Sequence, residues 1–320
     1  MLHAAYRSIV RRLPISLKAP LKNAALSILG GAPNQRLMRR VIGPGGSTDP
    51  TNPIAFAESS TLAAVQDHLA RHPSTLLEMS FARQAIAGDR ARNLMKNLKR
   101  FSGPGEAIAH NTLEYNLTAF EPGSAPVMER PMLLVAAVCS IDKLLHNRDR
   151  FSVLVIGPRS ENEIFGLFAA GFSPEKTRGL DLFSYSPFVD VGDMHALPYA
   201  DDSFDVIIHS FALSYSRTQD LAAREMIRVA KDRAIIAIGD EYKDEADKVV
   251  SENRKRLFQN EATYTRGCDQ ILKLFDGHVR RSFIHHDPDP PESIVVMSVF
   301  ELSKPTDLDR PNATRPAPRS

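Results

Sequence analysis

The feature that most constrains the fold is a regular alternation of short apolar runs and helical segments after Asp149. Apolar runs of strand length occupy residues 152–156, 178–182, 205–210, 233–238, 278–285 and 293–302. Segments with helical periodicity lie near 161–170, 219–230 and 244–275. Strands that alternate with helices predict a parallel sheet covered by helices on both faces.

The last two apolar runs follow each other with only a Pro- and Asp-rich loop between them. This spacing predicts a hairpin, so we expect at least one antiparallel edge strand. The sequence thus predicts an α/β fold. Its core is a Rossmann-like, doubly wound sheet of about seven strands, mostly parallel, with an antiparallel C-terminal hairpin.

The N-terminal part of the chain predicts a helical extension. Residues 42–53 are rich in Gly, Pro, Ser and Thr and indicate a linker, and the pattern from 54 to about 100 is helical. A further helix opens near Pro131. Its expected apolar side comprises Leu133, Leu134, Ala137, Ile141, Leu144 and Leu145. The predicted divisions are 1–50 (basic segment and linker), 51–130 (helical extension), 131–303 (α/β domain) and 304–320 (disordered tail).

Composition excludes several classes of protein. Apolar residues make up 43% of the chain, charged residues 24%, and the net charge is +2, so the chain is not a nucleic-acid polycation. Its two cysteines, Cys139 and Cys268, lie far apart in no ligand spacing. This argues against a disulfide framework and a zinc site, and it suits a reducing compartment such as the cytoplasm. No run approaches the ~20 apolar residues of a membrane span.

The first acidic residue is Asp49, and eight Lys or Arg residues precede it. Apolar residues among the first thirteen form a helical stripe, with Arg7 and Arg11 on another face. Three interpretations of this basic amphipathic helix stay open. It packs on the protein, it lies on an anionic membrane surface or a partner, or it is a targeting segment.

The stretch "VLVIGPRSENEIFGLF", residues 153–168, reads as strand, tight loop and helix. Ser160 and Glu163 have the spacing of a capping box at the start of that helix. In open α/β sheets, ligands bind outside the carboxyl ends of the strands, where strand order reverses. Asp181 follows Gly157 by 24 residues. At ~20 residues from such a glycine, a carboxylate typically accepts hydrogen bonds from ribose hydroxyls.

"GDMHALPYADDSFDVIIHS", residues 192–210, resembles the acidic loop and fourth strand of class I S-adenosylmethionine-dependent methyltransferases. "AAREMIRVAKDRAIIAIGDE", residues 222–241, is similar to the helix and fifth strand that follow in that family. The resemblance covers residues from about 130 to 303. It implies the family's fold, methyl transfer as the activity, and S-adenosylmethionine as the cofactor.

Carried over by position, the resemblance implies a set of cofactor-binding residues. Gly157 matches the first glycine of the cofactor loop, which continues through Pro158. Asp181 matches the acid that holds the ribose, with Leu182 beside it. Asp193 matches the acid that accepts from the adenine amino group, and the backbone of Met194 reads the ring edge.

The loop departs from the family pattern. The family has an acid two residues before the first glycine, where this chain has Val155, and its further glycines align with Arg159 and Glu161. Two interpretations stay open. Arg159 clamps the cofactor's carboxylate in a modified working loop, or the chain is a non-catalytic binding module with a degenerate loop. A nicotinamide-dependent dehydrogenase fits less well, because it needs Gly-x-Gly-x-x-Gly.

Three residues are candidates for chemistry on the acceptor. His209 ends the fourth strand and is either a general base or a buried structural group. Glu241 and Tyr242 follow the fifth strand, at the crevice rim. We expect a small-molecule, glycan or lipid-linked acceptor rather than nucleic acid, because no basic stripe with interleaved aromatics is present. "IHHDPDPPE", residues 284–292, is interpreted as a hairpin loop and not a metal site.

Overall fold

We describe a computed structural model of the chain. The structure describes residues 59–103, 130–216, 218–242, 265–289 and 294–304. The chain divides into two compact units, Met1–Leu76 and Leu77–Ser320. The predicted basic helix, the linker and the C-terminal tail beyond residue 304 lie outside the described residues, as does most of the predicted helix at 244–275.

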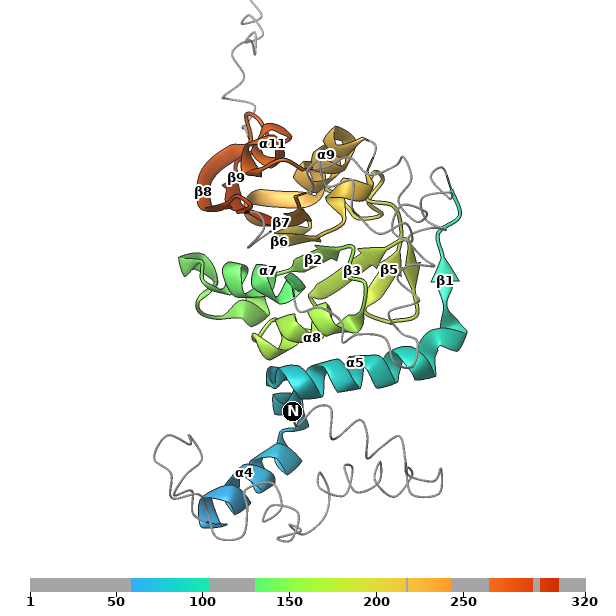
Figure 1. The fold of residues 1–320 in the computed structure, drawn as a ribbon, viewed down its shortest axis with the longest axis vertical. Helices are drawn as coiled ribbons and strands as arrows, with labels where there is room; N and C mark the ends of the chain where they lie inside the picture. The colour runs from blue at the N-terminus through green and yellow to red at the C-terminus, as the bar shows by residue number, and fades with distance from the viewer. Residues whose placement is uncertain (1–58, 104–129, 217, 243–264, 290–293, 305–320) are drawn as a thin grey trace, which may run out of the picture. The chain divides into compact units, whose positions relative to one another are not determined.

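Seven of the strands form one sheet (Figure 1). In chain order they are β2 (Val153–Ile156), β3 (Thr177–Asp181), β5 (Val189–Val191), β6 (Phe204–Ser210), β7 (Ala230–Glu241), β8 (Val279–His286) and β9 (Val295–Leu302). A separate two-stranded antiparallel ribbon joins β1 (Lys99–Arg100) to β4 (Phe183–Ser184).

In the first unit, α4 (Ser59–Arg71) carries an ion pair between Asp67 and Arg71. The other α-helices, all in the second unit, are α5 (Ser80–Leu94), α7 (Arg130–Cys139), α8 (Glu161–Ala169), α9 (Gln219–Val229) and α11 (Cys268–Lys273). Single 3₁₀ turns occur at Pro73–Glu78, Met95–Asn97, Asp142–Leu144, Arg148–Arg150 and Leu213–Tyr215.

The order of strands across the sheet is β5-β3-β2-β6-β7-β9-β8. The chain starts at the centre with β2, builds outward through β3 to β5, and returns to β6 on the other side. These pairs are parallel, and only β9 is antiparallel to its neighbours. The order therefore reverses between β2 and β6. In doubly wound sheets, ligands bind outside the carboxyl ends of the strands beside such a reversal.

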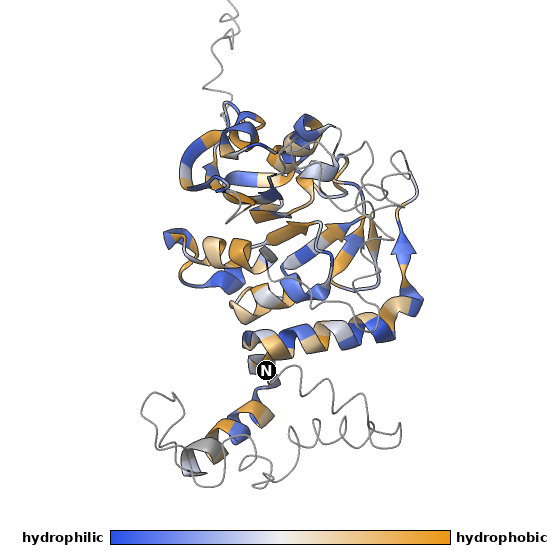
Figure 2. Cartoon of the chain, in the orientation of Figure 1, coloured by the Kyte–Doolittle hydropathy of each residue, from blue (hydrophilic) through white to orange (hydrophobic). Residues whose placement is uncertain are grey.

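The core has two layers because successive strand residues face opposite sides of the sheet. In β2, Val153 and Val155 pack on the side of α7 and α8, whereas Leu154 and Ile156 pack on the side of α9 and α11. All four are almost fully buried, as in a strand covered on both faces. Figure 2 shows β2 apolar along its length and α5 mixed in hydropathy.

Helix α5 packs against α8, outside the sheet's own helical layer (Figure 1). Its Arg90 forms a two-pronged pair with Glu161, with Nε–Oε2 at 2.7 Å and Nη2–Oε1 at 2.9 Å. The guanidinium also lies 5.6 Å from the ring centre of Phe165 and 5.7 Å from that of Phe188. The helical extension from α5 onward is thus part of the compact unit that begins at Leu77.

The predicted fold class is confirmed, as is the closing hairpin. The expectation of an antiparallel edge strand is wrong in its detail. The antiparallel strand β9 lies inside the sheet, and the edge strand β8 runs in the parallel direction. The hairpin returns β9 between β7 and β8, which leaves β8 as the edge.

The helix predicted from Pro131 is shorter than its apolar pattern. It ends at Cys139, where the Ser140 hydroxyl donates to the carbonyl of Ala137 at 2.6 Å and the chain turns. Of its expected apolar side, Leu133 and Leu145 remain about half exposed. No helix among the described residues is long and apolar enough to cross a membrane.

Candidate functional site

The loop after β2 is built around Gly157. Its φ of 74° lies in the left-handed region, and a Cβ at this position would come within 2.6 Å of the Ala212 side chain. Its backbone N–H donates to the carbonyl of Leu180 at 2.9 Å, which ties the loop to β3. Pro158 is buried, and its ring packs against Gly179 of β3. The loop is therefore held down on the sheet edge.

Asp181 is the last residue of β3 and lies at the same edge of the sheet. Its side chain is buried, and burial raises the pKa of its carboxyl to about 7 against the opposing effects of the Leu182 and Phe183 backbone N–H groups and of Arg159. The carbonyl of Asp181 accepts from Gly192 N–H at 2.9 Å. Backbone hydrogen bonds therefore join the segments that carry Gly157, Asp181 and Asp193 at the carboxyl edge of the sheet.

Asp193 lies in the loop after β5 and is held by His195. Its Oδ1 accepts from the backbone N–H of His195 at 3.0 Å and contacts Nδ1 of that ring at 2.6 Å. The ring's Nε2 lies 2.6 Å from the Ser216 hydroxyl. These bonds lower the pKa of the Asp193 carboxyl, although burial opposes them. Oδ2 makes no hydrogen bond within the described part of the chain, so it can accept one from a ligand.

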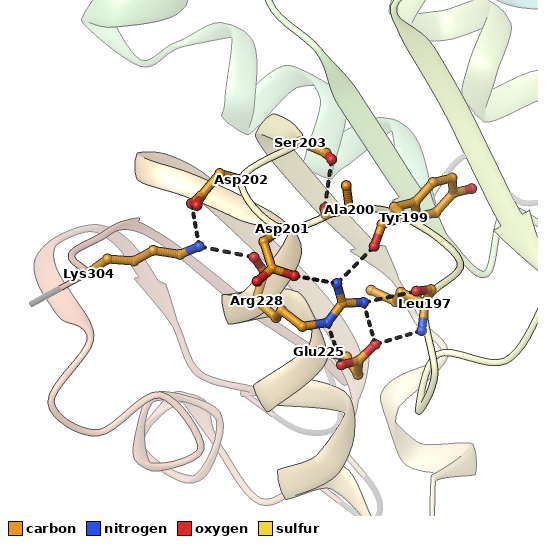
Figure 3. A network of polar contacts seen from close by, with 9 residues as sticks. All are labelled: Leu197, Tyr199, Ala200, Asp201, Asp202, Ser203, Glu225, Arg228 and Lys304. Carbon is orange, nitrogen blue, oxygen red and sulfur yellow. Dashed lines mark hydrogen bonds and ion pairs between the residues drawn. The ribbon is translucent and has the colours of Figure 1, made fainter.

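A polar network fixes the segment that follows Asp193 (Figure 3). Arg228 of α9 donates to the carbonyls of Leu197 and Tyr199 at 2.9 and 2.8 Å. Glu225 accepts from the backbone N–H of Leu197 at 2.7 Å and pairs with Arg228. Backbone carbonyls and N–H groups in a loop need such partners when they are withdrawn from water. Two side chains of α9 therefore hold the backbone of the loop that follows Asp193.

Glu161 stands where the family has a glycine, yet its side chain turns away from the loop. The carboxylate is fully buried and pairs with Arg90 of α5, and the Ser186 hydroxyl donates to Oε1 at 2.7 Å. The glutamate at this position therefore ties α8 to α5 through the pair with Arg90.

Glu163 does not close a capping box. Ser160 is the N-cap, as predicted, but its hydroxyl accepts from Asn162 N–H at 3.3 Å. The carboxyl of Glu163 is buried, and Oε2 has no hydrogen-bond partner among the described residues. Burial raises its pKa to about 8. Ser210 and Arg159 lower this pKa and Asp181 raises it further, so these groups surround the carboxyl.

His209 ends β6 at the centre of this edge. It is fully buried, and neither ring nitrogen has a hydrogen-bond partner in the described ranges. Burial lowers its pKa to about 3, with a smaller contribution from His195. At neutral pH the ring is therefore a neutral imidazole and a weak base. So low a pKa makes the ring a poor general base, whereas a buried structural histidine normally has hydrogen-bond partners, so both alternatives for His209 stay open.

The two other acceptor candidates lie at the end of β7. The N–H of Glu241 donates to Oδ1 of Asp240 at 2.9 Å, and Tyr242 N–H donates to Ile294 O at 2.7 Å. Both side chains are half-buried. Asp240 is buried and accepts from the Thr265 hydroxyl, and burial raises its pKa to about 6. The strand expected at 233–238 extends through Glu241, and this extension carries Asp240 into the buried end of β7.

The remaining predicted cofactor contacts have structural partners. The Leu182 carbonyl accepts from Phe101 N–H at 2.7 Å, next to the short ribbon of β1 and β4. Met194 is half-buried and packs against the apolar core on the α9 side. Arg159 is half-buried and stabilises negative charge on both Glu163 and Asp181. The sequence does not indicate the α5 clamp, because Arg90 and Glu161 are 71 residues apart, and it indicates only a capping role for Glu163.

The fold brings Cys268 to the end of β8, which its position in the sequence did not suggest. Its sulfur, the His285 ring and the Asp287 carboxylate have ligand atoms within 4.8 Å of one another. The thiol, however, donates to the carbonyls of His286 and Met297, both at 3.2 Å, and Asp287 Oδ1 accepts from Cys268 N–H at 2.7 Å. These bonds account for the cluster as a structural link between α11 and the hairpin.

Comparison with known proteins agrees with this geometry. Residues 188–301 match the family model described as a methyltransferase domain. This match covers less than half of the chain, and it agrees with the sheet order and with the resemblance of residues 192–241 to class I S-adenosylmethionine-dependent methyltransferases. The protein is accordingly an enzyme of the methyltransferase class, and its cofactor is S-adenosylmethionine.

Several solved structures are similar to the chain at low identity. A SAM-dependent methyltransferase from Thermotoga maritima is 13% identical, with 62% of this chain and 99% of that chain covered and a TM-score of 0.40. A chain from the complex of the Haloferax volcanii Trm112 methyltransferase activator with a methyltransferase is 17% identical, with 63% and 100% covered and a TM-score of 0.42. The CurJ carbon methyltransferase is 11% identical, with 76% and 71% covered and a TM-score of 0.45. No curated protein matches the chain.

The residues at the crevice fit the cofactor of this class. Asp181 offers a buried carboxyl for hydroxyl groups, and Asp193 keeps one oxygen open for an amino group. The unpartnered Oε2 of Glu163 is a buried acceptor without a donor. Buried polar groups normally have partners, so an orphaned one at a ligand crevice indicates a group that the ligand supplies.

Proposed function

We propose that this enzyme transfers the methyl group of S-adenosylmethionine to a small-molecule, glycan or lipid-linked acceptor. The observation that carries the proposal is the joining of the Gly157, Asp181 and Asp193 segments at the strand ends where sheet order reverses. We place the reaction in the cytoplasm. A peripheral membrane contact through the basic N-terminal segment belongs to the same proposal.

The cofactor, when bound, supplies a methyl group that is already activated on a sulfonium. The residues of this chain then have to bind the cofactor, orient the acceptor and exclude water from the site. We assign Asp181 to the ribose hydroxyls, the Asp193 carboxylate and the Met194 backbone to the adenine, and Arg159 to the cofactor's carboxylate. Gly157 and Pro158 shape the floor beneath, and Leu182 flanks the ribose acid.

Orientation of the acceptor is the main catalytic contribution that we assign to the protein. Holding two reactants in line converts a bimolecular step into an effectively unimolecular one. The low pKa of His209 supports a reaction in which this ring takes no proton from the acceptor. We assign Glu241 and Tyr242, on the rim at the end of β7, to contacts that hold the acceptor.

Calorimetric titration and a transfer assay test this proposal. The full-length protein should bind S-adenosylmethionine and its demethylated product saturably. It should also pass a labelled methyl group to a component of a small-molecule, glycan or lipid extract, identified by mass spectrometry. Asp193→Ala and Arg159→Ala should each weaken cofactor binding, the first at least tenfold (about 1.4 kcal/mol). A protein that binds neither compound, or binds them without transferring the label to any extract, contradicts the proposal.

A further inference from the structure

We propose that Glu163 is a cofactor-binding residue whose carboxylate receives the ammonium group of the methionyl end, and that it releases a proton when the cofactor binds. This inference rests on the proposed function and adds to it a residue and a proton-linked binding step. The family pattern has its acid on the first strand, at the position of Val155 in this chain. Here the carboxylate would come instead from the helix that follows the loop.

The first support is the place of the side chain. Glu163 lies in the first turn of α8, three residues beyond the N-cap Ser160, and its side chain is buried. The groups that surround it are Arg159 from the loop, Asp181 from β3 and the Ser210 hydroxyl from β6. Three chain segments that converge on the cofactor crevice therefore present polar groups to one carboxyl.

The second support is the missing partner. Glu163 is 6% exposed, and its Oε2 has no hydrogen-bond partner among the described residues. Withdrawing a carboxyl from water without compensation is costly, and a charged carboxylate costs far more than a neutral one. A buried carboxyl with one oxygen left unsatisfied, placed among these segments, is a candidate for ligand binding.

The third support is complementarity of charge. The methionyl end carries an ammonium and a carboxylate on the same carbon. Arg159 is a cation, and its charge favours the ionised form of Glu163. An arginine for the ligand's carboxylate and a glutamate for its ammonium match this zwitterion group for group. Asp181 remains assigned to the ribose, on the β3 side of the crevice.

The two buried acids explain why a proton should leave. Burial raises the cost of ionising Glu163 and the nearby Asp181 adds to it, so the free protein keeps Glu163 protonated near neutral pH, with a pKa of about 8. An ammonium placed beside the carboxyl favours its ionised form. Binding then expels the proton to solvent, and a new N⁺–H···O⁻ bond forms in place of the buried O–H.

Calorimetry at pH 7 in buffers of different ionisation enthalpy measures this proton directly. A carboxyl with a pKa of about 8 is about nine-tenths protonated at pH 7. We expect Glu163→Gln to reduce the number of protons released by about 0.9. It should also weaken both S-adenosylmethionine and S-adenosylhomocysteine at least tenfold, since both ligands carry the ammonium group. The matched control is Glu175→Gln, at an exposed carboxyl outside the site, and it should behave as wild type.

Wild-type protein provides a second measurement that is independent of how the variant folds. Its affinity for S-adenosylmethionine should rise with pH between 6.0 and 7.5, by about tenfold per unit where Glu163 is the proton that leaves. Binding that is unchanged by pH, or equal affinity and proton release in Glu163→Gln, overturns the inference and leaves the proposed function standing. Failure of the wild-type protein to bind either ligand at any pH overturns the proposed function itself.

Discussion

At the scale of single residues, the carboxyl edge of the sheet is a set of buried titratable groups. Burial raises the pKa of Glu163 to about 8, of Asp181 to about 7 and of Asp240 to about 6, and it lowers that of His209 to about 3. Withdrawal from water thus disfavours the charged form of every one of these groups. A ligand group of opposite charge placed beside one of them would favour its charged form instead.

This pattern predicts a fall in stability with rising pH. A raised carboxyl pKa means that folded Glu163 and Asp181 keep protons that the unfolded chain has already released. The free energy of unfolding should therefore decrease between pH 6.5 and 8, by up to about 1.4 kcal/mol per pH unit for each group. His209 acts in the other direction around and below its unfolded pKa, so its opposing effect is greatest at the lower end of this window and fades toward pH 8.

Urea unfolding at pH 6.5, 7, 7.5 and 8 measures the slope. Glu163→Gln should make the profile shallower, since it removes one of the two groups, whereas Glu175→Gln should leave the slope unchanged. A wild-type profile that is flat or rises over this window would mean that the two carboxyls are already ionised.

Gly157 allows backbone strain to be separated from a steric clash. Gly157 and Gly171 both have φ in the left-handed region, at 74° and 93°, but a Cβ at Gly171 meets nothing within 4 Å. Gly171→Ala should cost about 1 kcal/mol, from backbone conformation alone. Gly157→Ala should cost more and should also weaken cofactor binding, because its Cβ would overlap Ala212. Equal losses in thermal unfolding and unchanged binding would contradict this account of the loop.

At the scale of elements, α5 acts as an external brace on α8, the helix that carries the cofactor loop. Arg90 pairs with the fully buried Glu161, and Arg83 donates to the side chain of Asn162 at 3.2 Å. Both contacts fall in the first turn of α8, next to the loop. The brace therefore links a segment outside the α/β sheet to the geometry of the site.

Removal of Arg90 tests the brace. Arg90→Ala should lower the free energy of unfolding by about 1–3 kcal/mol. It leaves a buried carboxylate with fewer partners, although the partial exposure of Arg90 reduces the effect. It should also weaken cofactor binding. The matched control is Arg92→Ala on the same helix, which breaks an exposed pair with Asp89 and should change stability by less than about 0.5 kcal/mol. Similar losses in the two variants, measured by urea unfolding, would exclude a special role for Arg90.

The elements also show what could be predicted from the chain and why. Strands such as β2 and β6 were predictable, because continuous apolar runs bounded by turns are local signals. The three-residue strand β5 was not, since Val189–Val191 is too short to show a period and owes its form to pairing with β3. Likewise the pairing of Arg90 with Glu161 spans 71 residues, and no local pattern encodes it.

For the site, spacing and resemblance identified Gly157, Asp181 and Asp193, which the structure places on neighbouring segments. They did not identify Glu163, because a glutamate at the third helical position is normally a capping residue. Only the position of Ser210 and Asp181 around its carboxyl distinguishes it. Similarly, the role of His195 as the partner of Asp193 depends on a loop geometry that periodicity does not specify.

At the scale of the whole molecule, the second unit contains both the doubly wound sheet and the helix α5 that braces α8. It begins at Leu77, so α5 and the β1–β4 ribbon belong to it by contact. The expected boundary between the helical extension, residues 51–130, and the α/β domain, residues 131–303, stays a prediction. The reversal of strand order between β2 and β6 brings three loops of separate origin to one edge, which is where the account places the cofactor.

The most direct test of this placement is a crystal structure of the full-length protein with S-adenosylhomocysteine. We expect the ribose at Asp181, the adenine at Asp193 and Met194, and the amino-acid end between Arg159 and Glu163. The nucleoside bound elsewhere on the protein, or the space between Gly157, Asp181 and Asp193 filled by the protein's own side chains, would contradict it.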